Sequence, residues 1–134
     1  MLAHCQCRNL TAEIADDAQP MVVMCHCIDC QRRSGSQFGS IAYYPVAAVV
    51  IAGPVQEFTR PTDSGNAFTT GFCPSCGSTV YARSSRMPEI MGVTVGTIAD
   101  PAFPRPLRSV YEQSKHHWID LPDSIPHHTR GRDS

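Results

Sequence analysis

The sequence predicts a mainly β fold with little helix, made of several small antiparallel sheets. Eleven prolines and nine glycines divide the 134 residues into short segments, and both residue types end regular structure. Apolar residues in these segments alternate with polar ones or form short runs, as strands require. The length suits one domain with its own core. We assign this domain to residues 1–122 and expect a flexible tail over 123–134.

The strands are expected in order along the chain. The segment 10–14 alternates apolar and polar residues and ends at the turn 16–20. Further strands, each bounded by turn residues, are expected at 21–24, 38–44, 49–51, 55–59, 67–72, 79–82, 90–97 and 107–111. One short helix is expected at 28–34, and Gly35 ends it because glycine readily adopts the left-handed backbone of a helix C-terminus.

All seven cysteines lie in three tight groups: a CxC pair, a CxCxxC run and a CxxC pair. They are Cys5 and Cys7; Cys25, Cys27 and Cys30; and Cys73 and Cys76. Thiolates one or two residues apart converge on one point, and converging thiolates bind soft metals, most often zinc. Four such ligands close a structural zinc site, whereas three leave one position open. Seven cysteines therefore predict two zinc ions, one in a closed site and one in an open site.

Two pairings of these groups compete. In the first, the closed site consists of Cys5, Cys7, Cys73 and Cys76, and the open site of Cys25, Cys27 and Cys30. In the second, the two CxxC pairs form a zinc ribbon, which leaves three soft ligands unused. The count of ligands favours the first pairing. Disulfides are disfavoured, because the number of cysteines is odd and the neighbours in a CxC pair suit a bridge poorly.

The open site predicts chemistry at its three cysteines, which we interpret as catalytic. A zinc ion with a vacant position takes water or an incoming thiol, and it lowers the pKa of that thiol until the thiol ionises. Because zinc does not change oxidation state, the chemistry expected is attack of the thiolate on carbon. In the other interpretation both metals are structural, and the second zinc gains a fourth ligand from His4, His26 or Asp29.

The composition argues against several classes of partner. A formal net charge of −1 disfavours nucleic-acid binding, since a phosphate backbone attracts basic surfaces. No segment has the length and apolar character of a membrane span, and the N-terminus lacks the pattern of a signal peptide. We therefore expect a cytoplasmic protein without a membrane partner, in which thiols stay reduced and clustered cysteines serve as metal ligands.

The cysteine groups and the residues around them resemble those of the glutathione-dependent formaldehyde-activating enzyme family, whose relatives include a centromere-associated protein. The resemblance covers nearly the whole chain. The matching residues are Cys5-x-Cys7, Cys25-His26-Cys27-x-x-Cys30-Gln31-Arg32 with Ser34-Gly35, Phe72-Cys73-x-x-Cys76-Gly77, Gly96-Thr97-Ile98, and Ser114-Lys115-x-x-Trp118 with Leu121. The chain departs from the family pattern where Ala3 and Arg8 replace glycines, Ala99 an aspartate and Ser109 a histidine.

The resemblance implies a fold similar to the methionine sulfoxide reductase B scaffold, with a structural zinc held by the first pairing. It also implies a second zinc on the other three cysteines, at a glutathione site. The family reaction condenses glutathione with formaldehyde and is grouped with those of carbon–sulfur lyases, so the expected partners are glutathione or a related thiol and an aldehyde. Arg32 and Arg33 directly follow the open site, and we expect them to bind the carboxylates of glutathione; a solvated helix face is the other interpretation.

Two other functions stay open from the sequence. The chain can be a non-catalytic zinc module that binds a protein partner, as the centromere-associated relative suggests. Reductase chemistry, by analogy with methionine sulfoxide reductase B, requires a free cysteine of low pKa. The first pairing leaves no cysteine for that purpose.

Overall fold

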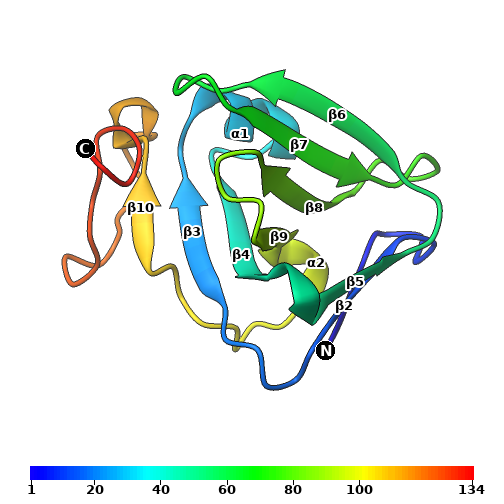
Figure 1. Cartoon of the computed structure of the whole chain (residues 1–134). Helices are drawn as coiled ribbons and strands as arrows, with labels where there is room; N and C mark the ends of the chain where they lie inside the picture. Colours follow the sequence, from blue (N-terminus) through cyan, green and yellow to red (C-terminus); the bar gives the residue numbers. More distant parts are fainter.

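The computed structural model describes the whole chain, residues 1–134. Strands dominate it, which confirms the predicted mainly β fold (Figure 1). The strands are β1 (Leu2–His4), β2 (Thr11–Ile14), β3 (Met21–Cys25), β4 (Gly39–Pro45), β5 (Val49–Ala52), β6 (Gln56–Pro61), β7 (Ala67–Phe72), β8 (Thr79–Ser84), β9 (Ile90–Thr94) and β10 (Arg108–Val110). The short helices are α1 (Ile28–Ser34) and α2 (Val95–Ile98), with 3-10 turns η1 (Val46–Ala48) and η2 (Glu112–Ser114).

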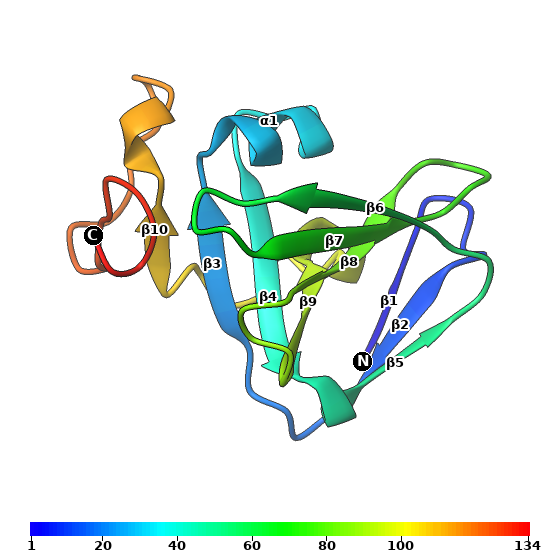
Figure 2. The ribbon, with the colours of Figure 1, turned by 45° about the horizontal axis from the view of Figure 1, so that its top comes forward.

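The strands form two sheets. β1, β2 and β5 make a three-stranded antiparallel sheet, and the other strands form a seven-stranded sheet in the order β10-β3-β4-β9-β8-β7-β6. Neighbours in the larger sheet are antiparallel except β10 and β3, which run parallel. This sheet bends strongly, so that β6 and β7 run across the direction of β3 and β4 (Figures 1 and 2). The bend brings the turn between β6 and β7 close to α1 and the end of β3.

The main hydrophobic core lies between the two sheets. The small sheet and its loops contribute Ala3, Leu10, Ala12, Ile14 and Val49, and the large sheet contributes Val22, Ala42, Tyr44, Val80 and Val93. Because successive side chains of a strand point to opposite faces, β4 directs Tyr44 into this core and Tyr43 to the other face. Tyr43 there lines a cavity that also contains three cysteines.

Helix α1 matches the predicted segment 28–34. The sulfur of Cys27 accepts a hydrogen bond from the backbone N–H of Cys30 at 3.3 Å and so caps the first turn. Gly35 ends the helix with a φ of 70°, and its N–H donates to the carbonyl of Gln31. The CxxC spacing and the start of the helix are therefore one local structure, in which the first helical turn holds two thiols beside the end of β3.

The strand predicted at 90–97 is shorter in the structure. β9 ends at Thr94, and residues 95–98 form α2. The hydroxyl of Thr97 donates to the carbonyl of Thr94 at 2.7 Å, and the hydroxyl of Thr94 donates to the carbonyl of Thr79 at 2.8 Å. The bond between Thr97 and Thr94 is local and competes with the hydrogen-bond ladder of a sheet, so the strand ends at Thr94 although the alternating pattern continues.

The segment 123–134, for which we expect a flexible tail, lies beside β10 (Figure 1). The backbone N–H of Ser109 donates to the carbonyl of Pro126 at 3.0 Å, and its carbonyl accepts from the N–H of His128 at 2.9 Å. The side chain of Ile125 is buried. The flexibility of the segment stays a prediction, but its contacts give it a defined place at the edge of the large sheet.

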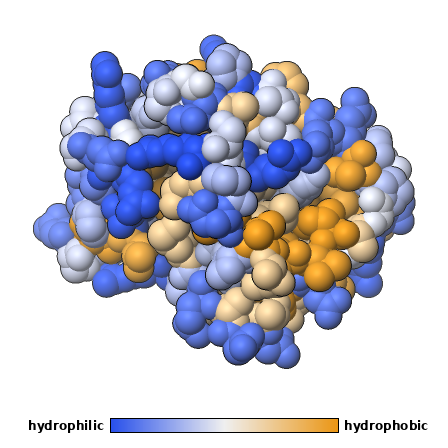
Figure 3. Space-filling model, in the orientation of Figure 1, coloured by the Kyte–Doolittle hydropathy of each residue, from blue (hydrophilic) through white to orange (hydrophobic).

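The surface divides into regions of different polarity. Figure 3 shows strongly hydrophilic residues across the upper middle of one face and a hydrophobic patch on its right-hand half. Large apolar side chains that are more than half exposed include Val50 at 63%, Phe58 at 61% and Trp118 at 58%. No helix of the chain combines the length and the apolar character needed to cross a membrane.

Candidate functional site

The first group of cysteines, here called the closed cluster, consists of Cys5, Cys7, Cys73 and Cys76. Its four sulfur atoms all lie within 4.8 Å of one another. The sulfur of Cys7 is 3.6 Å from that of Cys5 and 3.5 Å from that of Cys73. Two come from the loop between β1 and β2, and two from the turn between β7 and β8. The cluster therefore joins the two sheets, and its members are those of the first pairing.

Backbone and hydroxyl donors surround the closed cluster and favour ionised sulfur. The N–H of Leu10 donates to the sulfur of Cys5 at 3.3 Å, and the N–H of Ser75 donates to that of Cys73 at 3.4 Å. The hydroxyl of Ser78, followed by its N–H, lowers the pKa of Cys76 to about 5. Backbone hydrogen bonds also lower the pKa of Cys73, whereas that of Cys7 is raised beside its neighbouring thiols. Four convergent soft donors fit a tetrahedral zinc ion.

The second group, here called the open cluster, consists of Cys25, Cys27 and Cys30. Cys25 ends β3, and the other two lie at the start of α1. The three sulfur atoms lie within 4.8 Å of one another. A hydrogen bond from the thiol of Cys25, together with one from Cys30, holds the pKa of Cys27 well below its usual range, whereas the pKa of Cys25 is raised by sharing its proton with Cys27. Three sulfurs that compete for protons at this distance fit a soft cation.

The possible fourth ligands point elsewhere. His26 is fully buried, and its Nε2 lies 3.0 Å from the hydroxyl of Ser109, on the face away from the sulfurs. The carboxylate of Asp29 lies 3.4 Å from a guanidinium nitrogen of Arg60. His4 contacts the carbonyl of Cys5, beside the other cluster. No imidazole or carboxylate joins the three sulfur atoms within 4.8 Å, so the cluster has a free side.

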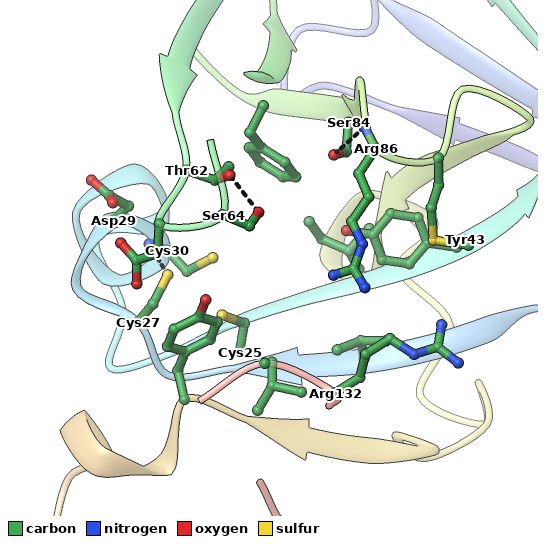
Figure 4. A pocket seen from close by; sticks show the side chains of 18 of the residues that line it. Cys25, Cys27, Asp29, Cys30, Tyr43, Thr62, Ser64, Ser84, Arg86 and Arg132 are labelled. Atoms are coloured by element: carbon green, nitrogen blue, oxygen red, sulfur yellow. Dashed lines mark hydrogen bonds between the residues drawn. The ribbon is translucent and has the colours of Figure 1, made fainter. Parts of the chain in front are cut away.

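A cavity of about 260 Å³ opens at the free side of the cluster (Figure 4). Its lining includes all three cysteines and apolar side chains of β3 and β4, namely Met21, Val23, Ile41 and the ring of Tyr43. Tyr111 lines it as well, after the end of β10. Burial raises the pKa of both tyrosines, so both hydroxyls stay protonated at neutral pH. The volume approaches that of small-molecule sites in proteins.

Arginines from separate parts of the chain also line this cavity: Arg60, Arg86, Arg108 and Arg132. Arg60 pairs with Asp29 and lies 4.9 Å from the ring centre of Phe68. Arg86 pairs with Asp133 at 2.8 Å. Arg108 and Arg132 have no acidic side chain within 4.0 Å. Sequence reasoning missed all four. The one available signal was composition, because ten of the eleven basic residues are arginine, whose guanidinium group binds carboxylates with two hydrogen bonds.

Arg32 and Arg33, which we expect to bind substrate, line a neighbouring cavity of about 390 Å³. It shares Asp29, Cys30, Arg60 and Phe68 with the first cavity. The guanidinium of Arg33 lies against Gly39, where an added Cβ would be 2.5 Å from Nη2. Arg33 therefore occupies the space that this glycine leaves open. Its role in substrate binding, and that of Arg32, stays a prediction.

Comparison with known proteins agrees with this geometry. The family model described as glutathione-dependent formaldehyde-activating enzyme matches residues 1–114. The chain belongs to this family. A crystal structure of a Rhodobacter sphaeroides protein, a structural genomics target, has a similar fold, with a TM-score of 0.55, 18% identity and coverage of 95% of this chain and 99% of that chain. A search of curated proteins gives no match.

The matched residues include both cysteine clusters and end at η2. Of the residues that line the cavity beside the open cluster, only Gly131 and Arg132 lie beyond the match. The family match therefore covers the metal ligands and most of the cavity wall, but not the C-terminal segment that completes it.

Proposed function

We propose that this protein is an enzyme that joins a small-molecule thiol, glutathione or a close relative, to formaldehyde or a similar aldehyde. The product is S-hydroxymethylglutathione or a close analogue. Because the reverse reaction breaks a carbon–sulfur bond, we class the protein as a carbon–sulfur lyase. The observation that carries the proposal is the open cluster, whose three sulfur atoms have a free side in a cavity. Membership of the family whose model matches residues 1–114 supports it. We place the reaction in the cytoplasm, where thiols stay reduced.

Both clusters have the donors that zinc requires, and we propose one zinc ion in each. The closed cluster supplies four thiolates and serves the fold, whereas the open cluster supplies three. Zinc bound at the open cluster would lower the pKa of an arriving thiol and favour its thiolate. The cavity supplies the rest of the site, and the apolar side chains beside the cysteines would limit the contact of the reacting atoms with water.

The reaction needs a nucleophile and a proton donor. The substrate sulfur attacks the aldehyde carbon, so that a carbon–sulfur bond forms while the π electrons of the carbonyl move to its oxygen. That oxygen then takes a proton from a hydroxyl in the cavity, which regains one from solvent, and the proton lost by the thiol passes to solvent. Tyr43 and Tyr111 line the cavity as protonated hydroxyls, so we assign the role of proton donor to this pair. We further propose that Arg32 and Arg33 contact a carboxylate that extends into the second cavity.

Titration calorimetry of glutathione into the zinc-loaded protein tests binding, and NMR exchange spectroscopy with formaldehyde tests turnover. The expected result is saturable binding at millimolar glutathione and faster exchange between free formaldehyde and S-hydroxymethylglutathione than in buffer. Cys27→Ser, which removes one sulfur of the open cluster, is expected to lose both. Absence of binding and of accelerated exchange in the wild-type protein would contradict the proposal and leave the non-catalytic zinc module as the better description.

A further inference from the structure

The C-terminal segment 122–134, here called the terminal arm, extends the large sheet beyond β10. The backbone of Ser109 exchanges hydrogen bonds with Pro126 and His128, and a parallel bridge pairs Ser109 with His127. Farther along, the N–H of Tyr111 donates to the carbonyl of Arg130 at 2.8 Å. The C-terminus lies beside β10 in both views (Figures 1 and 2). The arm is thus attached to the strand that carries part of the cavity wall.

The end of the arm forms one wall of the cavity beside the open cluster. Gly131 and Arg132 line that cavity, and an added Cβ at Gly131 would lie 3.9 Å from the hydroxyl oxygen of Tyr111. Figure 4 shows Arg132 and Arg86 away from the cysteines, on the opposite part of the same pocket. The cavity therefore extends from the sulfurs to the arm.

Two ion pairs hold the arm, one near its middle and one near its end. Nδ1 of His127 lies 2.7 Å from a carboxylate oxygen of Glu112, while Nε2 lies 2.9 Å from the carbonyl oxygen of Pro122 within the arm. Near its end, Asp133 accepts from Arg86 at 2.8 Å. The arm is therefore fixed to residues of the matched part of the chain on either side of Arg132.

The positive charges that line this cavity are not all balanced by acidic side chains of the protein. Asp29 and Asp133 neutralise Arg60 and Arg86. Arg108 and Arg132 have no such partner, and the Nε of Arg108 is buried without any hydrogen-bond acceptor. A buried guanidinium nitrogen without an acceptor is costly unless a ligand supplies one. A carboxylate matches the fork geometry of guanidinium groups.

We propose that the terminal arm determines which thiol this protein binds, because Arg132, together with Arg108, binds a carboxylate at the end of the substrate farthest from the sulfur. The proposal rests on the proposed function, since it describes the other end of the same thiol site. The substrate class is then a thiol with a distant carboxylate. Simple neutral thiols lack the group that the arm recognises, and they are expected to bind weakly.

The test compares glutathione with its diethyl ester, in which both carboxylates are masked, by calorimetry on the zinc-loaded full-length protein. Wild type is expected to bind glutathione at least about tenfold more tightly than the diester, as hydrogen bonds to charged groups allow. Arg132→Gln is expected to weaken glutathione binding about tenfold and to leave diester binding unchanged. Arg132→Lys should restore part of the loss. Arg105→Gln, at an exposed arginine that lines neither cavity, is the matched control.

Hydrogen exchange of the His128 and Tyr111 amides reports docking of the arm independently of affinity, because both amides join the arm to β10. Unchanged protection in Arg132→Gln, with added protection of wild type by glutathione, supports the proposal. Equal weakening of glutathione and diester, or no weakening of either, overturns it while the proposed function stands. A wild-type protein that binds neither compound overturns both.

Discussion

The two cysteine clusters differ in what they connect. The closed cluster takes its sulfurs from two loops, and the contact between Cys7 and Cys73 spans 66 residues of sequence and joins the two sheets. The open cluster takes its sulfurs from one short run at the junction of β3 and α1. A site that joins distant segments contributes to folding, whereas a local site adds little to tertiary structure. The proposed chemistry is therefore assigned to the local cluster.

The surroundings of the two clusters also differ, because only the open cluster borders the two main cavities. Backbone N–H groups and the hydroxyl of Ser78 surround the sulfurs of the closed cluster, and no cysteine of that cluster lines either of the two main cavities. The open cluster borders a cavity with two tyrosines and four arginines. The number of sulfur ligands and their surroundings thus both indicate a structural closed cluster and an accessible open cluster. Removing one sulfur from each cluster in turn tests this difference.

The largest effect is expected from Cys73→Ser in the closed cluster. A four-thiolate zinc site contributes on the order of 10 kcal/mol to folding, which is comparable to the whole stability of a domain, about 5–15 kcal/mol. The variant is therefore expected to lack cooperative thermal unfolding by circular dichroism and to retain no zinc at this cluster by native mass spectrometry. Ser75→Ala, in the same turn, is the control and should unfold like wild type. A folded Cys73→Ser protein would refute the structural role of the closed cluster.

A smaller effect on stability, but a larger one on binding, is expected from Cys27→Ser in the open cluster. The variant should stay folded with its melting temperature lowered by only a few degrees, about 1 kcal/mol. Native mass spectrometry is expected to find one zinc ion instead of two, and glutathione affinity is expected to fall at least about tenfold. Unfolding of this variant, rather than loss of binding, would show that both clusters are structural.

Local spacing predicted which thiols converge within each group, and the count of ligands predicted that Cys5 and Cys7 join Cys73 and Cys76. A CxxC turn brings its own two thiols together whatever the rest of the fold, and Gly35 indicates the end of α1 by its left-handed backbone. The segment 67–72 is a strand with the predicted bounds. The three-residue strand β1 and the parallel pairing of β10 with β3 have no such local signal, since they depend on contacts between distant segments.

The four arginines of the cavity could not be predicted together from the sequence either. Arg60, Arg86, Arg108 and Arg132 come from β6, the turn after β8, β10 and the terminal arm, and no spacing in the sequence connects them. Arg32 and Arg33 follow Cys30 after one residue, Gln31, yet they line the neighbouring cavity. Spacing in the sequence predicted the metal ligands of each group, whereas the arginine-lined part of the cavity depends on the bend of the large sheet and on the path of the C-terminal segment.

Docking of the terminal arm, on the side of the open cluster, is expected to depend on pH through His127. Both ring nitrogens of His127 face acceptors, and the carbonyl of Pro122 and the carboxylate of Glu112, with Asp123 nearby, raise the pKa of His127 above its usual 6.5. The charged ring stabilises the docked arm fully below pH 6.5, and this contribution is lost as pH rises through the raised pKa. An NMR titration of the His127 ring and the arm amides is expected to show both changes at one midpoint.

His127→Gln is expected to remove that titration of the arm amides. His128→Gln is the matched control, because the ring of His128 forms one hydrogen bond, to the carbonyl of Ser134, and no ion pair with an acidic side chain. Arm amides that titrate unchanged in His127→Gln would show that another group controls the docking. Neither variant is expected to alter zinc in the closed cluster, which keeps the test specific to one side of the molecule.

The smallest effect is expected from Arg8→Gly, beside the closed cluster. Arg8 has a φ of 70°, a left-handed conformation that costs an L-residue about 1–2 kcal/mol. Glycine relieves this cost but loses roughly 0.5–1 kcal/mol through its greater freedom in the unfolded chain. The melting temperature is therefore expected to rise by a few degrees at most, without a change in glutathione binding at the open cluster. Arg8→Ala separates the causes, because alanine removes the side chain and keeps the strained backbone. An equal rise in Arg8→Ala would attribute the effect to the arginine side chain and not to the turn that holds Cys5 and Cys7 together.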